Sequence, residues 1–161
     1  MNDADFMRYA IELGHAKMLE IGAAPFAAVV VKDGKIVGEG CNTVLIDHAP
    51  TLHGEVAAIR DACRRLGTFD LSGCDIYTSC EPCEMCVAAI WWARLDRVFY
   101  ANALGDTAAM MPIDGLTNDV SKPIDKRSIP ARQLMAGEAF AVIKEWVDNG
   151  QSAALMTRPQ R

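Results

Sequence analysis

The feature that most constrains this chain is a group of three cysteines within seven residues, in the stretch TSCEPCEMC at 78–86. Pro82 suits the first turn of a helix, where its missing N–H is not needed, and CEMCVAAIWWAR continues with strong helix formers. On such a helix Cys83 and Cys86 lie on one face, close enough for both sulfurs to reach one ion. The positive end of the helix dipole favours their thiolate forms, which are the forms that bind metal.

Taken alone, this cysteine pair leaves three interpretations open. It is typical of a metal site, of a thioredoxin-like redox pair, or of half of a structural zinc ribbon. Glu84-Met85 between the cysteines and a strand pattern led by a hairpin do not suggest thioredoxin, and the ribbon lacks a second C-x-x-C. The other cysteines are expected to be buried core thiols: Cys41, Cys63, Cys74 and Cys80.

Helical and strand-like segments alternate along most of the chain. Apolar spacing predicts helices over 6–22 and 53–67, in addition to the one that begins near Pro82. Strands are expected in PFAAVVVKDGKIVGEG, where Asp33-Gly34 suits a hairpin turn, in CDIYTS and in RVFYA. This alternation indicates an α/β fold, which we expect to be a three-layer α/β/α sandwich with a central mixed β-sheet.

The pattern weakens after Ala101. Some thirty residues carry Gly, Pro and Asp with little periodicity, which predicts a partly ordered lid over about 102–131. A last helix is expected over about 137–148, within a C-terminal helix and tail at 137–161. A chain of 161 residues without repeats or a linker is expected to form a single domain, 1–161.

Charge and composition narrow the choice of partner. The net charge is −5 and the basic residues are scattered, which is a weak footprint for nucleic acid and favours a small-molecule substrate. The first residues include acidic side chains and no apolar run of signal-peptide or membrane-spanning length. We therefore expect a cytoplasmic protein that binds neither nucleic acid nor membrane. Because the cytoplasm is reducing, we expect the six cysteines to be buried thiols, metal ligands or catalytic residues and not a disulfide framework.

A second motif, HGE at 53–55, strengthens the metal interpretation. One imidazole and two thiolates give zinc three protein ligands and leave the fourth tetrahedral position open for water, as a catalytic site requires. A lone histidine at a helix start is usually structural, but beside the cysteine pair His53 becomes a ligand candidate. Two positions apart, His53 and Glu55 would face nearly opposite ways on an ideal helix, although a side chain in the first turn can curl over the helix end.

H-x-E followed by P-C-x-x-C is the signature of zinc-dependent base deaminases. Through these residues the chain resembles the cytidine/deoxycytidylate deaminase superfamily, and within it the bacterial guanine deaminases. The likeness runs from about Phe6 to Pro130. The matching stretches are APFAAVVVKDGKIVGEGCN, PTLHGEVAAIRDAC, CDIYTSCEPCEMCVAAIWWARLDRVFYA and IDKRSIP.

The resemblance implies a cytidine deaminase-like fold and a zinc-dependent aminohydrolase of purine metabolism, which converts guanine to xanthine and ammonia. His53, Cys83 and Cys86 would hold Zn²⁺, and Glu55 would transfer the protons. A guanine nucleoside or another aminated heterocycle is the alternative substrate. Adenosine in transfer RNA is less favoured, because the net charge of the chain is negative. A non-catalytic zinc-binding structural module is the alternative of another class, although such a module has no use for Glu55.

Other site residues carry over by position. Asn42 matches a family asparagine that hydrogen-bonds the base, and Asp114 matches an acidic lid residue. Phe26 and Trp92 match aromatic residues that line the base pocket. Each also has a plain structural interpretation, as a turn residue or a core aromatic. Gly54 departs from the usual Ala or Cys of H-x-E, and its missing side chain implies a roomier pocket beside the substrate.

The resemblance also concerns assembly. It implies a homodimer, domain-swapped so that a C-terminal segment of the neighbouring subunit closes the site through an aromatic residue. The tail QSAALMTRPQR has no aromatic residue, and Met156 is the candidate for that place.

Overall fold

The structure is a computed structural model that describes residues 1–107 and 114–156. The chain divides into two compact units, Met1–Thr117 and Asn118–Arg161. The first unit carries α1 (Asp3–Ile21), β1 (Ala24–Lys32), β2 (Lys35–Asn42), α2 (Val44–Asp47), α3 (Gly54–Leu66), β3 (Cys74–Cys80), α4 (Glu84–Trp92), β4 (Arg97–Asn102) and α5 (Leu104–Thr107). Helix α6 (Asp114–Val120) crosses the boundary, and η1 (Ile124–Lys126), α7 (Ala136–Asp148) and α8 (Ala153–Met156) follow.

Four strands of the first unit form one mixed sheet in the order β2-β1-β3-β4. Strand β1 runs antiparallel to both β2 and β3, whereas β3 and β4 are parallel. Asp33 and Gly34 join β1 to β2 with φ angles of 49° and 73°, as a tight hairpin turn requires. The parallel pairing brings the carboxyl ends of β3 and β4 to the same edge, where Cys80 pairs with Asn102.

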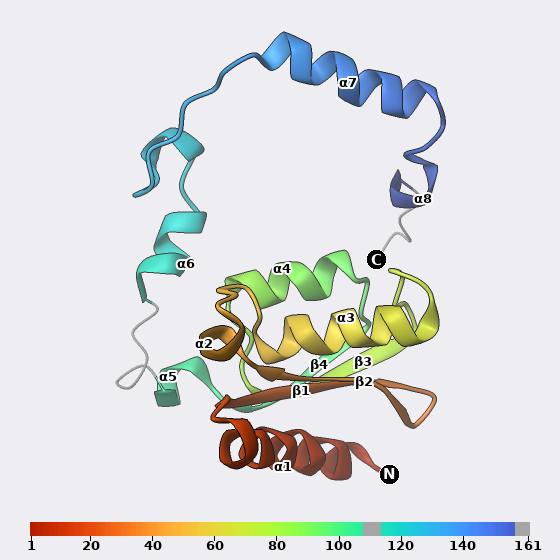
Figure 1. The fold of residues 1–161 in the computed structure, drawn as a ribbon, viewed down its shortest axis with the longest axis vertical. Coiled ribbons are helices and arrows are strands. Elements are labelled where there is room, and N and C mark those ends of the chain that lie inside the picture. The colour runs from red at the N-terminus through yellow and green to blue at the C-terminus, as the bar shows by residue number, and fades with distance from the viewer. Residues whose placement is uncertain (108–113, 157–161) are drawn as a thin grey trace. The chain divides into compact units, whose positions relative to one another are not determined.

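Helices cover both faces of this sheet (Figure 1): α1 lies on one face, and α3 and α4 lie on the other. Successive residues of β1 serve the two cores because side chains alternate along a strand. Val29 and Val31 pack with Phe6 of α1, while Ala28 and Val30 belong to the core beneath α3 and α4. The predicted α/β/α sandwich with a central mixed sheet is confirmed.

Helix α3 packs closely on β2 because two glycines of that strand leave room for its backbone. A Cβ atom at Gly40 would lie 2.2 Å from the Ala58 nitrogen, and one at Gly38 would lie 2.5 Å from the Ala58 oxygen. Real Cβ atoms do not approach backbone so closely, so any larger residue would push the helix away from the sheet. These glycines thereby fix the height of the α3 N-terminus above the sheet.

The second unit consists of the 13-residue α7 and shorter helical segments joined by loops. In it, Asp119 accepts hydrogen bonds from the Ser128 nitrogen and hydroxyl at 2.8 and 2.9 Å. Helix α7 coincides closely with the last helix that the sequence predicts, whereas the four-residue α2 is not predicted. Within the described ranges, no helix is long and apolar enough to cross a bilayer.

Candidate active site

Two helix N-termini meet at the site. His53 is the N-cap of α3 and Cys83 is the N-cap of α4, and both have extended backbone angles. Their carbonyl oxygens accept the first helical hydrogen bonds, from the Ala57 and Val87 nitrogens at 2.9 and 2.8 Å. Neither side chain is used as a helix cap. Each is therefore available to point away from its own helix toward the other.

His53, Cys83 and Cys86 form a compact donor set. The two sulfurs lie 3.7 Å apart, and the His53 Nδ1 atom lies 3.7 Å from Cys83 Sγ and 3.5 Å from Cys86 Sγ. Zinc bonds of about 2.0–2.3 Å in a tetrahedron place such ligand atoms roughly 3.5–3.8 Å apart. The triangle of donor atoms therefore fits a zinc ion, with one coordination position left over.

Electrostatics at the two thiols also suit a cation. The hydrogen bond between Cys83 and Cys86, aided by His53, lowers the pKa of the Cys83 thiol, which favours its thiolate form. The same proximity to Cys83 raises the pKa of Cys86. Cys83 in its thiolate form therefore disfavours a second thiolate at Cys86. A cation shared by the two sulfurs would remove this opposition, because it would stabilise both as thiolates.

Glu55 is a buried carboxylic acid on the first turn of α3, with 6% of its surface exposed. Burial raises the pKa of this carboxyl above its ordinary value. The side chain lines the same cavity as His53 and Cys83. The helix start thus lets both residues of the H-x-E motif reach one space, a relation that spacing on an ideal helix does not predict.

The cavity beside the donor set has a volume of about 220 Å³. This is below the roughly 300–1,000 Å³ typical of clefts for drug-sized ligands, which suits a small ring compound. Three residues that the sequence analysis did not assign to the site, Cys80, Glu81 and Leu104, lie in its wall. The lining residues are Phe26, Asn42, His53, Glu55, Cys80, Glu81, Cys83 and Leu104.

Of the predicted substrate residues, Phe26 and Asn42 line the cavity. Phe26 lies near the start of β1 and is half-buried, and Asn42 ends β2. The Asn42 Oδ1 atom accepts a hydrogen bond from the Val44 nitrogen at 3.2 Å, so the residue also shapes the turn into α2. Its side-chain NH₂ is the donor that it can offer to a ligand.

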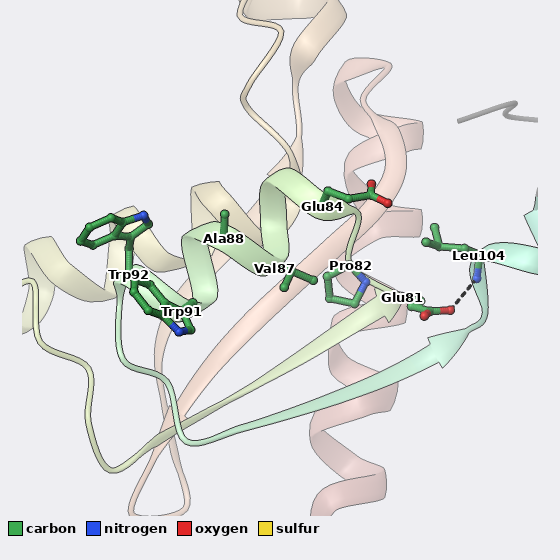
Figure 2. Close-up of a pocket in the computed structure, with 8 residues that line it drawn as sticks. All are labelled: Glu81, Pro82, Glu84, Val87, Ala88, Trp91, Trp92 and Leu104. Atoms are coloured by element: carbon green, nitrogen blue, oxygen red, sulfur yellow. Dashed lines mark hydrogen bonds between the residues drawn. The ribbon is translucent and has the colours of Figure 1, made fainter. Parts of the chain in front are cut away.

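Trp92 does not line this cavity. It ends α4, nine residues after the N-cap Cys83, and a helix rises about 1.5 Å per residue, so the two are about 13 Å apart along the axis. Trp92 instead lines a separate hollow along α4 with Trp91 and Val87 (Figure 2). Trp92 has 65% of its surface exposed, and its predicted contact with the base remains a prediction.

Gly54 also differs from expectation. It is buried and does not line the cavity. A Cβ atom there would lie 2.9 Å from both the Ala27 Cα atom and the Phe26 oxygen. The expected open space beside Gly54 is thus filled by the backbone of β1, and the glycine instead lets α3 approach that strand.

Two predicted residues lie where side chains are not described. Asp114 begins α6, and Met156 ends α8, but both side chains fall outside the described part of the structure. Their predicted contacts with a ligand remain predictions.

The newly found lining residues differ in how far the sequence could have indicated them. Cys80 and Glu81 follow one another at the carboxyl end of β3, and such strand ends commonly carry site residues. Leu104 gave no signal, because the segment after Ala101 has no periodicity from which a buried or lining position can be read.

Comparison with known proteins agrees with this geometry. Residues 1–102 match the family described as the cytidine and deoxycytidylate deaminase zinc-binding region. Guanine deaminase of Bacillus subtilis (strain 168) is 42% identical over 147 residues, which cover 91% of this chain and 94% of that enzyme. Its X-ray structure matches with a TM-score of 0.87 and 40% identity, covering 92% of this chain and 95% of that one. A tRNA-specific adenosine deaminase of Aquifex aeolicus is 40% identical over 85 residues, or 53% of this chain and 56% of that protein.

Proposed function

The chain belongs to the cytidine and deoxycytidylate deaminase zinc-binding family, and on this premise we propose that it hydrolyses guanine to xanthine and ammonia, as an enzyme of purine metabolism. The observation that carries the proposal is the buried Glu55 beside the donor set of His53, Cys83 and Cys86, in a chain homologous to guanine deaminase over most of its length. A structural zinc module has no need of a carboxylic acid in that position.

His53, Cys83 and Cys86 would hold the zinc ion, since their spacing fits tetrahedral bonds. When bound, zinc polarises a water molecule and lowers its pKa toward neutrality. The residues of this chain then have two tasks, which are to hold the base beside that water and to move protons.

Glu55 is the proton carrier in this proposal. Its carboxylate accepts a proton from the attacking water and delivers it to the ring nitrogen beside the carbon under attack. The new C–O bond replaces the C–N bond to the exocyclic amine, and a second proton passes through Glu55 to the departing amine, which leaves as ammonia. Burial keeps the carboxyl away from bulk water, so its protons go to the substrate.

The base would be held by the walls of the cavity. Phe26 offers an aromatic surface to a flat ring, and the Asn42 NH₂ group can donate to a purine acceptor such as O6. We further propose that Asp114 accepts from a base N–H, within a lid over about 102–131 of a single deaminase domain. A free base suits a cavity of about 220 Å³ better than a nucleoside does.

We also propose that the protein is a cytoplasmic homodimer, domain-swapped through its C-terminal segment. The hollow along α4 supports an interface, because large apolar side chains lie exposed there (Figure 2). Trp91 and Trp92 have 48% and 65% of their surfaces exposed, and Val87 has 54%. Apolar groups gathered in this way commonly mark an interaction site.

An ammonia-release screen tests the substrate assignment directly. Purified protein is supplied with guanine, guanosine, adenine, adenosine, cytosine, cytidine and a transfer RNA, with zinc measured in the same sample. Release from guanine well above all others is expected. Preference for a nucleoside or for transfer RNA would replace the proposed substrate, and no release with one zinc bound per chain would favour a structural zinc module.

A further inference from the structure

Glu81 links two parts of the chain at the rim of the cavity. It follows the last residue of β3, and its backbone nitrogen donates to the Asn102 oxygen at 2.7 Å. Its Oε2 atom accepts a hydrogen bond from the Leu104 nitrogen at 2.9 Å (Figure 2). One residue therefore holds the chain on both sides of Ala103, where β4 passes into α5.

The side-chain bond goes beyond what the sheet requires. The β3–β4 ladder ends with the pair Cys80 and Asn102, and the backbone bond of Glu81 prolongs it by one step. The carboxylate reaches two residues further, to Leu104. That residue and Glu81 both line the active-site cavity and also the hollow along α4, so Leu104 forms part of the partition between them.

Leu104 depends on such contacts for its position. It begins α5, which has only four residues, and a helix of that length has little stability of its own. The neighbouring Ala103 nitrogen donates to Asp106 Oδ2 at 3.0 Å, and Thr107 Oγ1 donates to the Leu104 oxygen at 3.1 Å. These bonds hold α5 together internally, whereas the Glu81 bond ties it to the β3–α4 connection.

We infer that Glu81 is a positioning residue that fixes Leu104 as an apolar wall of the cavity and thereby sets the fit of the substrate base. The inference rests on the proposed function for the identity of that base. Phe26 and Leu104 are the large apolar side chains among the lining residues, and they come from separate elements. A flat ring needs apolar contact on its faces, so a displaced Leu104 widens the cavity and weakens binding before it affects the proton transfers of Glu55.

The test compares two uncharged variants of similar length. Glu81→Met loses the hydrogen-bond acceptor, whereas Glu81→Gln keeps one. In Glu81→Met we expect kcat/KM for guanine to fall about 10-fold to 200-fold, mainly through KM, which is the range for altered apolar contacts in a pocket. Glu81→Gln should stay within about threefold of the parent protein, and zinc should remain at one per chain in both. Glu81→Ala repeats the measurement should Glu81→Met fail to fold.

Two further measurements separate positioning from a general loss of structure. Hydrogen exchange of the Leu104 amide should be at least tenfold faster in Glu81→Met but not in Glu81→Gln. Leu104→Ala should raise KM in the same way, and adding Glu81→Met to it should cost little more, since residues that act through one another are not additive. Unchanged KM in Glu81→Met, or fully additive losses in the double variant, would overturn the inference.

Failure of the proposed function is recognised separately. In that case the parent protein does not deaminate guanine, and KM is measured for whichever base the ammonia screen identifies. The exchange of the Leu104 amide does not depend on turnover and still shows whether Glu81 holds this residue. Slow exchange in Glu81→Met would overturn the positioning role whatever the substrate is.

Discussion

The Nδ1 atom of His53 lies 3.5 Å from the Sγ atom of Cys86, although 33 positions separate the two residues. The contact exists because α3 and α4 lie side by side on the same face of the sheet, with their N-termini at the same end (Figure 1). Neither helix contains the site alone. The metal-binding set therefore depends on the packing of the two helices. A change that moves either helix should disturb the ligand positions on both.

Cys83→Ala should lose zinc and stability together, because formation of the site and folding are linked. We expect less than one zinc per chain by elemental analysis and a lower melting temperature in the same sample. Chelation of zinc from the unaltered protein should lower the melting temperature in the same direction. Full zinc in the Cys83→Ala variant would count against this residue as a ligand.

Glu55→Gln should keep zinc yet lose most turnover, because an amide cannot shuttle protons. General acid–base groups contribute about 10²–10⁴-fold, and we expect kcat for guanine to fall by that amount. Binding of guanine, measured by calorimetry, should change far less. Near-normal rates in this variant would remove Glu55 from the catalytic role.

Asp114→Ala tests the predicted acceptor at the start of α6. If this carboxylate meets the base, guanine turnover should fall by about 10²-fold or more, as for other positioned polar contacts. Zinc content and melting temperature should stay nearly unchanged. Unaltered turnover would leave Asp114 with only a structural place at the start of α6 and would weaken the assignment of guanine as the substrate.

Gly40→Ala should destabilise the first unit, since the added Cβ atom would lie 2.2 Å from the Ala58 nitrogen. Overpacking of this kind costs about 1–3 kcal/mol in free energy of unfolding, and denaturant titration measures it. Gly105→Ala is the matched control, because nothing lies within 4 Å of a Cβ atom there. Equal stabilities of the two variants would show that α3 does not depend on this close approach.

Light scattering at micromolar concentration should give the mass of a dimer. Trp92→Asp should shift that mass toward the monomer, because it places a charge in the apolar hollow of α4. Leu19→Asp is the control, since Leu19 is 71% exposed on α1, across the sheet from α4. A monomeric parent protein would contradict the proposed dimer.

Much of the fold was readable in local patterns. The apolar run of β1, the Asp33-Gly34 turn and the apolar spacing of α3 each depend on neighbours in sequence, and the structure has all three. The four-residue α2 was missed because so short a helix leaves no periodicity to detect.

At the site, the sequence by itself determined which chemical groups are present and how Cys83 and Cys86 are spaced, since residues i and i+3 share a helix face. Only the tertiary structure decided which distant groups meet them. It fills the space beside Gly54 with the β1 backbone and brings Leu104 into the cavity wall. These outcomes depend on the pairing of β3 with β4 and on the height of α3 above the sheet, which are long-range contacts that no local pattern encodes.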